Sequence, residues 1–263
     1  MGVDFSGSRE AGLALWIAWG ESDRQRLVIR ACMPAADLPG GGRDRPSAHR
    51  ALAQCLRRSG ACVAGLDFPF SLPEAQLDEL AWIDFLKAFP GRFPTADTYY
   101  RSTQARFGEM RRRTDRELRA PFAPNNLRLY RQTYYGLRDV LLPLVTADSV
   151  RVLPLQRRRA GVPWLLEACP AAALKRLDLR RAYKGRSRAH RRHRLELLAS
   201  WERTAGLVLD GGALRRTVVE QPGGDALDSV LAAWIAWRSV SGRDFARPRD
   251  AQERREGRIY DGC

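Results

Sequence analysis

Lysine, histidine and paired cysteines are scarce in this chain, and each scarcity excludes a class of protein. Only three of the 45 basic residues are lysine. The five cysteines form no Cys-x-x-Cys pair and leave one over, so the pattern indicates neither a zinc site nor a disulfide framework. The three histidines are too few and too scattered for a catalytic triad.

Long apolar runs are also absent. The longest, 230–237, is far too short to span a bilayer. The N-terminus enters a strand-like run at once, without the basic and apolar regions of a signal peptide. We therefore expect no membrane association and a cytoplasmic location. With 263 residues, 44% of them apolar, the chain is predicted to bury one core as a single domain, 1–263.

Positive charge is what the chain has in excess. Its 45 basic residues outnumber 30 acidic ones, which gives a net charge of +15 at neutral pH. GC-rich coding explains why arginine replaces lysine, but it does not explain the excess of charge. The planar guanidinium group matches phosphate oxygens. We therefore expect a phosphate-rich partner, nucleic acid above all.

The first part of the chain predicts a small mixed sheet. Apolar runs at 2–7, 13–19 and 26–33 are joined by short polar links and predict an antiparallel meander. Ser47 is a candidate N-cap for the helix that comes next. A buried strand follows at 61–68, and a strand–helix–strand unit predicts a parallel, right-handed crossover.

The stretch 70–150 differs in character, because it is rich in proline, aromatic residues and arginine. Its clearest element is a helix predicted at 127–145. We expect a mostly helical insertion after the fourth strand that builds one wall of a cleft. Alternation returns at 162–168 as a fifth strand, and the final helix is predicted at 226–240. The fold class is therefore α/β, with a mixed five-stranded sheet flanked by helices.

Acidic residues stand where the predicted strands end or a helix begins: Asp4, Asp67, Glu167, and the pair Asp225 and Asp228. Strands on either side of one crossover helix are neighbours, so the carboxylates of Asp4 and Asp67 should repel each other unless a cation lies between them. Mg²⁺ takes oxygen ligands. Two such ions, about 4 Å apart, can activate a water and stabilise the leaving oxygen of a phosphodiester.

Each acid also has a structural alternative. In this alternative, the Asp4 carboxylate would hydrogen-bond to the backbone of a turn, and Asp67 would cap a turn. Glu167, inside an apolar strand, would need an ion pair with an arginine. Asp225 follows two glycines and makes a good N-cap. Asp228 lies one turn further along a helix expected to be buried, and it is the better ligand.

The basic residues concentrate in the segment 180–194. Lys184 follows a tyrosine there, and we expect it to contact a phosphate or the transition state. A second polar segment, 110–119, predicts either a solvated face or a phosphate-contacting arm. The residues expected to bind nucleic-acid phosphates are Arg180, Arg181, Lys184, Arg186, Arg188, Arg191 and Arg192.

The motifs VDFSG, GLDFPFSLP, PWLLEACPAAALKRL, YKG, DALDSVLAAWIAW and EGRIYDG, in this order, resemble the uncharacterised domain family 429, a predicted nuclease family. The order of strands, helices and acids is similar to the ribonuclease H-like superfamily. The resemblance implies that fold and a Mg²⁺ or Mn²⁺ site. Its residues would be Asp4, Asp67, Glu167 and Asp228, with Asp225 in support.

Three functions follow from these observations. The leading hypothesis is a metal-dependent nuclease that hydrolyses DNA or RNA by a two-metal mechanism. The alternative is a nucleic-acid-binding protein that keeps the fold without chemistry, although such a protein gains nothing from clustered acids near phosphate. An ATP-using phosphotransferase of the actin–sugar kinase type is disfavoured, because the chain is short and lacks a second Gly-rich phosphate loop.

Overall fold

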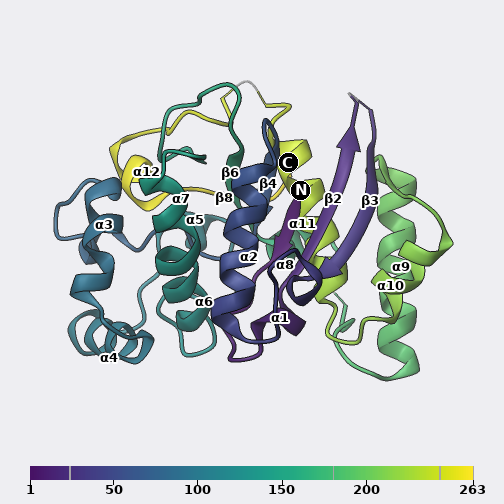
Figure 1. Cartoon of the computed structure of the whole chain (residues 1–263), viewed down its shortest axis with the longest axis horizontal. Helices are drawn as coiled ribbons and strands as arrows, with labels where there is room; N and C mark the ends of the chain where they lie inside the picture. The colour runs from purple at the N-terminus through teal and green to yellow at the C-terminus, as the bar shows by residue number, and fades with distance from the viewer. Residues whose placement is uncertain (24, 180, 243, 263) are drawn as a thin grey trace.

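The computed structural model describes residues 1–23, 25–179, 181–242 and 244–262 and shows one mixed sheet between layers of helices (Figure 1). The strand order is β5-β6-β4-β1-β2-β3-β7, and β8 pairs with β6 off this path. The strands are β1 (Gly2–Asp4), β2 (Trp16–Ser22), β3 (Leu27–Pro34), β4 (Val63–Leu66), β5 (Arg151–Leu153), β6 (Trp164–Ala168), β7 (Leu207–Leu209) and β8 (Ile259–Tyr260).

The first three strands form the antiparallel meander that the sequence predicts. β1 pairs with β2 and β2 with β3 in antiparallel register, and β4 lies parallel to β1. The other described pairs are parallel. The sheet exceeds the predicted five strands because β5, β7 and β8 have only two or three residues each, too few for alternation to be visible in the sequence.

The helices cover both faces of this sheet (Figure 1). No helix formed by the described residues has the length and apolar character needed to cross a bilayer. They are α1 (Ala11–Ala14), α2 (Arg45–Arg58), α3 (Trp82–Arg92), α4 (Ala96–Phe107), α5 (Arg113–Glu117), α6 (Tyr130–Tyr135), α7 (Leu142–Thr146), α8 (Pro170–Arg176), α9 (Arg188–Thr204), α10 (Gly212–Glu220), α11 (Asp225–Ser239) and α12 (Ala251–Glu256), with a π-helical turn at Gly136–Leu141 and 3₁₀ turns at Ala35–Asp37 and Glu74–Gln76.

The two faces of the sheet bury separate cores. Val3 and Ile17 pack with α2 and with the helices of the segment 70–150. Ala18 and Leu166 point to the other face and pack with α9, α10 and α11. The alternation of side chains along each strand therefore divides the apolar residues between two helical layers. The segment 70–150 is mostly helical, as predicted, and its role as a cleft wall stays a prediction.

Several predicted boundaries are wrong for local reasons. The run 13–19 begins with the last turn of α1, and β2 starts only at Trp16. The N-cap of α2 is Asp44, whose carboxylate accepts a hydrogen bond from the Ser47 amide. Pro46 is compatible with the first turn of a helix, so α2 begins earlier than the apolar pattern indicates.

Two predicted helices also differ in extent. The helix expected at 127–145 is divided into α6, the π-helical turn and α7. The helix α11 is not the last element, because α12 and β8 follow it and β8 enters the sheet. Both later elements are short, with six residues in α12 and two in β8, so they leave no periodic signal in the sequence.

The helix α11 lies unusually close to the sheet because the strands beneath it carry glycine. A Cβ atom on Gly2 would lie 2.1 Å from the backbone nitrogen of Ala233. A Cβ atom on Gly65 would lie 2.4 Å from the carbonyl oxygen of Ala232. Only glycine permits this approach, which brings the first turn of α11 over the ends of β1 and β4.

We predict that Gly65→Ala destabilises the protein by about 1–3 kcal/mol, because the added methyl group overpacks the contact between β4 and α11. Urea unfolding measures the change. Gly91→Ala is the matched control: a Cβ there meets no atom within 4 Å, and alanine favours the helix α3 by up to about 1 kcal/mol. Equal stability of Gly65→Ala and the wild type would contradict the packing account.

Candidate active site at the carboxyl ends of the central strands

Asp4 is the last residue of β1 and is buried. The loop that follows it is fixed by neighbouring helices. The carbonyl of Ser6 lies 2.8 Å from Nε2 of His49, on α2, and Arg45 donates to the carbonyl of Gly7. Gln132 of α6 donates to the carbonyl of Phe5. These contacts leave the Asp4 carboxylate facing the edge of the sheet, and it accepts no hydrogen bond from the described residues.

Asp67 follows β4, the strand beside β1. Its backbone amide donates to the carbonyl of Val3 at 3.0 Å, so the carboxylates of Asp4 and Asp67 leave adjacent strands at the same edge. The sequence predicts this adjacency from the crossover through α2, and the structure confirms it. Within the described part of the chain, the Asp67 carboxylate also accepts no hydrogen bond.

Asp228 approaches from the helix above. It lies in the first turn of α11, and its side chain is only 3% exposed. The hydroxyl of Tyr183 donates to its Oδ1 at 2.6 Å, and Nζ of Lys184 lies 2.6 Å from its Oδ2. The Tyr-Lys pair that stands out in the sequence thus holds both carboxylate oxygens of the acid expected to be the better ligand.

Mutual repulsion and burial dominate the electrostatics of these acids. Burial, followed by the charge of Asp228, raises the pKa of Asp4 well above its usual value. The same two causes raise the pKa of Asp67 to about 7. Burial lowers the pKa of Lys184, but the charges of Asp228, Asp4 and Asp67 outweigh it and raise the pKa above the usual range. One ammonium group therefore lies among three carboxylates.

Asp225 is not the N-cap that the sequence predicts. The cap residue of α11 is Gly224, in a left-handed conformation, and Asp225 is the first helical residue. Its carboxylate accepts a hydrogen bond from Nε2 of Gln221 at 2.8 Å, and its amide donates to Oε1 of the same side chain. Burial and the charge of Asp228 raise the pKa of Asp225. Asp225 therefore lies at the rim of the site and interacts electrostatically with its acids.

Glu167 lies in an ion pair instead of among these carboxylates. Its Oε2 accepts from Nη1 of Arg112 at 2.7 Å and its Oε1 from Nη2 at 2.5 Å, and the amide of Phe70 also donates to it. Arg112 is fully buried and contacts Asp115 as well. The structure thus favours the ion-pair alternative, because a fully buried guanidinium group compensates the charge of Glu167, and we assign it no metal.

The same ion pair corrects the expectation for the polar segment 110–119. Arg112 is not on a solvated face, because it links α5 to β6 and to the carbonyl of Glu256 in α12. The carboxylate of Glu256 in turn accepts from the amides of Glu74 and Arg113. Three parts of the chain that are distant in sequence therefore meet around one buried guanidinium group.

The predicted basic patch is partly neutralised by acids. Arg181 and Arg191 form ion pairs with Glu196 and Glu220, and Arg192 lies 3.8 Å from Glu196. Arg180 lies outside the described residues. Arg186 and Arg188 are exposed and have no ion-pair partner among the described residues.

Arg194, which the sequence analysis does not single out, is buried and holds the loop before α9. It donates to the carbonyls of Val219, Tyr183 and Gly185. These contacts fix the Tyr-Lys pair over Asp228. No local sequence signal marks this role, because Arg194 is one arginine in a run of basic residues.

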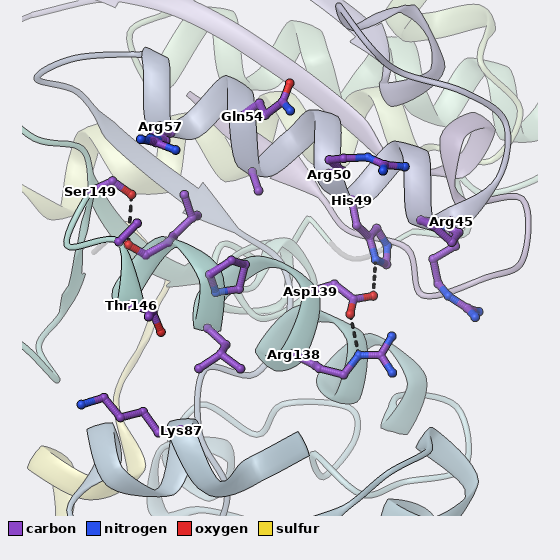
Figure 2. A pocket seen from close by; sticks show the side chains of 16 residues that line it. Arg45, His49, Arg50, Gln54, Arg57, Lys87, Arg138, Asp139, Thr146 and Ser149 are labelled. Carbon is purple, nitrogen blue, oxygen red and sulfur yellow. Dashed lines mark hydrogen bonds and ion pairs between the residues drawn. The ribbon is translucent and has the colours of Figure 1, made fainter. Parts of the chain in front are cut away.

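A cavity of about 980 Å³ lies between α2 and the helical segment 138–149 (Figure 2). His49 and Asp139 both line it and contact each other, with Nδ1 of His49 at 3.1 Å from Oδ2 of Asp139. Arg138 donates to the same carboxylate. Asp4, Asp67 and Asp228 do not line this cavity. Its polar groups hold the loop after β1 in place and do not add to the cluster of acids.

We predict that Glu167→Gln destabilises the protein by about 1.5–3 kcal/mol, because it removes charge-assisted hydrogen bonds and leaves Asp115 as the only carboxylate partner of Arg112 among the described residues. Glu220→Gln breaks a solvent-exposed pair with Arg191 and should change the stability far less, because water screens that pair. Chemical unfolding of the two variants measures the difference. If Glu167 were instead a metal ligand, Glu167→Gln would abolish metal binding and leave the stability of the metal-free protein unchanged.

Comparisons with known proteins give one match. No curated protein and no solved structure shows a significant match to the chain. Over residues 146–253, which include Lys184, Asp225 and Asp228, the chain matches the family described as "Protein of unknown function (DUF429)", and this match confirms the resemblance to domain family 429.

Proposed function

We propose that the protein is a divalent-metal-dependent nuclease that hydrolyses phosphodiester bonds of DNA or RNA, on a ribonuclease H-like arrangement of strands. The sheet order β3-β2-β1-β4-β6, with an antiparallel meander followed by parallel strands, supports the arrangement. The observation that carries the function is the convergence of Asp4, Asp67 and Asp228 around the ammonium group of Lys184.

The donor set fits Mg²⁺ or Mn²⁺ in its chemistry, because it supplies only oxygen ligands and more negative than positive charge. In the arrangement observed, no three His, Cys, Asp or Glu side chains of the described residues are placed as a metal site. The reason is visible at Asp228, whose two oxygens contact Tyr183 and Lys184. A divalent cation would therefore bind between Asp4, Asp67 and Asp228 in exchange for the Lys184 ammonium.

Each residue then has a defined task. A bound divalent cation would activate a water and stabilise the leaving oxygen. Asp4 and Asp67 hold negative charge on rigid strand ends, and Tyr183 keeps the Asp228 carboxylate oriented through its hydrogen bond. The half-exposed side chain of Lys184 would turn outward and contact a substrate phosphate once a cation has displaced its ammonium group from Asp228. A second cation would have Asp225 as a further ligand, because Glu167 is committed to Arg112.

One observation favours the non-catalytic alternative. Lys184 already compensates part of the charge of the three acids in the absence of a metal. A protein that binds nucleic acid without chemistry would keep this ion pair permanently. The two functions therefore differ in whether a divalent cation displaces the ammonium group.

We predict that Asp4→Asn and Asp67→Asn each lower the Mn²⁺-dependent cleavage of nucleic acid by at least about 100-fold, because each removes a carboxylate that holds the cation. Rates on labelled single-stranded and duplex substrates measure the effect. Asp37→Asn, at an exposed acid outside the cluster, should leave the rate unchanged. Cleavage that is absent in the wild type, or that survives both substitutions, contradicts the proposal.

Neutralising Asp67 should have the opposite effect on the stability of the metal-free protein. The pKa of Asp67 is about 7 in the folded state and near 4 in the unfolded state, so the folded protein loses stability as the pH rises from about 4 to about 7. We expect Asp67→Asn to be more stable than the wild type at pH 8 by at least about 1 kcal/mol, since one pKa unit corresponds to about 1.4 kcal/mol.

Thermal unfolding in EDTA and in Mn²⁺ measures this effect. Mn²⁺ should raise the melting temperature of the wild type, because a ligand that binds only the folded state stabilises it. It should not change that of Asp67→Asn. A metal-free Asp67→Asn protein that is less stable than the wild type at pH 8 would show that Asp67 is a structural residue and not a strained ligand.

A further inference from the structure

An arginine-lined cavity lies at the same edge of the sheet as the acidic cluster. Its volume is about 1500 Å³, and seven of its lining residues are arginine against only two acids, Glu117 and Asp244. None of these arginines belongs to the patch that the sequence predicts for nucleic acid. The positive charge of this cavity therefore comes from residues other than those of the predicted basic patch and of the cluster around Lys184.

The cavity is built at the exit of β5 and beside β8. Pro154 to Arg158 follow β5, and the segments before β8 supply the opposite side. Because β5, β6, β4 and β1 are parallel neighbours, their carboxyl ends lie at one edge. Two strand spacings of about 4.8 Å separate β5 from β4, so the exit of β5 lies about 10 Å from that of Asp67 along the sheet.

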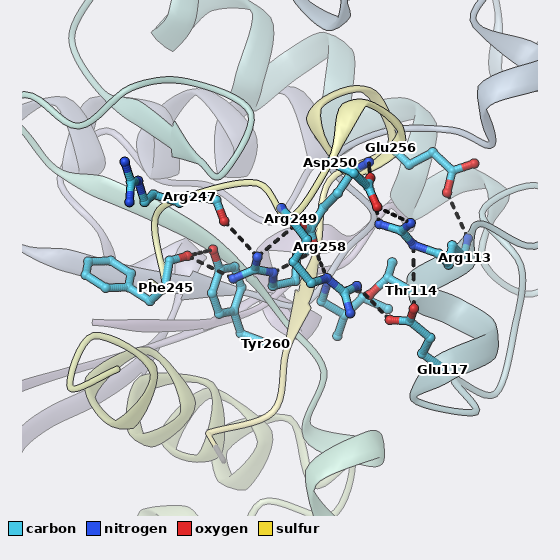
Figure 3. Close-up of polar contacts among 12 residues, drawn as sticks. Arg113, Thr114, Glu117, Phe245, Arg247, Arg249, Asp250, Glu256, Arg258 and Tyr260 are labelled. Carbon is cyan, nitrogen blue, oxygen red and sulfur yellow. Dashed lines mark hydrogen bonds and ion pairs between the residues drawn. The ribbon is translucent and has the colours of Figure 1, made fainter. Parts of the chain in front are cut away.

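Some of the arginines have structural partners. Arg249 contacts Glu117 (Figure 3). It also shares the buried Glu253 with Arg258. Arg258 also donates to the carbonyls of Phe245 and Arg247 and so fixes the loop that contributes to the cavity wall. The charges of these two arginines are neutralised within the protein, and their role is to hold the wall.

Other arginines of the cavity have no such compensation. Arg157, Arg158 and Arg254 are exposed, and within the described residues none of them has an ion-pair partner. The guanidinium group of Arg158 lies 5.7 Å from the ring centre of Trp164 and 5.6 Å from that of Phe245. These rings restrict its motion, so less entropy is lost when it binds an anion.

We propose that this cavity binds the phosphodiester backbone of a nucleic acid through Arg157, Arg158 and Arg254 and leads that strand to the acidic cluster. The inference rests on the proposed function, and it adds the location at which the substrate strand binds. An open cavity larger than the usual small-molecule pocket suits a polymer better than a compact ligand. Arginine is the side chain best matched to phosphate oxygens.

The test measures binding without cleavage. Fluorescence anisotropy follows labelled single-stranded and duplex DNA and hairpin RNA with the full-length protein in EDTA, for the wild type and for Arg157→Ala/Arg254→Ala. We expect at least a tenfold loss of affinity at about 150 mM salt, and a salt dependence whose slope falls by about 2, because two phosphate contacts are lost. Circular dichroism confirms that the variants are folded.

Two matched pairs act as controls. Arg101→Ala/Arg203→Ala removes two exposed charges elsewhere, on α4 and α9, and should change the affinity less than twofold. Arg186→Ala/Arg188→Ala tests the patch predicted from the sequence. The inference is overturned by an equal loss in all three double variants, by a loss confined to the 186/188 pair, or by the absence of nucleic-acid binding.

Two further outcomes separate this inference from the proposed function. If ATP or pyrophosphate competes as effectively as an oligonucleotide, the cavity binds small polyphosphates. That result would overturn the proposal that it binds the nucleic-acid backbone. Binding that depends on Arg157 and Arg254, in a protein that cleaves no substrate with Mn²⁺, would support the cavity and contradict the nuclease proposal.

Discussion

The close approach of α11 to the sheet determines where every candidate site residue lies. Gly2 and Gly65 are the points at which the helix backbone contacts the strands, and a side chain at either would displace it. Asp4 lies two residues after Gly2 on β1, and Asp67 lies two residues after Gly65, just beyond β4. The same contact therefore places both acids under Asp228, in the first turn of the helix. Packing of α11 on the sheet thus brings three carboxylates together although they repel one another.

The protein balances that charge in two different ways. Around Asp4, Asp67 and Asp228 the compensation is incomplete, and the single ammonium of Lys184 leaves the pKa values of Asp4 and Asp67 raised. Glu167, on the neighbouring strand, is fully engaged by the buried Arg112. We infer that the first cluster is adapted to an exchangeable cation, whereas the second is a permanent link between the sheet, α5 and α12.

The sequence predicts the elements of the site that depend on local pattern. The crossover through α2 predicts that Asp4 and Asp67 are neighbours, and the apolar helix after Asp225 predicts the burial of Asp228. It does not predict the partner of Glu167, because Arg112 lies 55 residues away in a polar segment without periodicity. The charge of the cavity beside β8 is equally hidden, since its arginines come from separate segments that only the fold brings together.

We propose that a divalent cation replaces the Lys184 ammonium among Asp4, Asp67 and Asp228. A crystal structure of the protein with Mn²⁺, analysed by anomalous diffraction, tests it most directly. The account predicts an anomalous peak bound by carboxylate oxygens of these three residues, with the Lys184 side chain turned away from Asp228. A map without a peak at that position, in which Nζ of Lys184 still contacts Asp228, would contradict it.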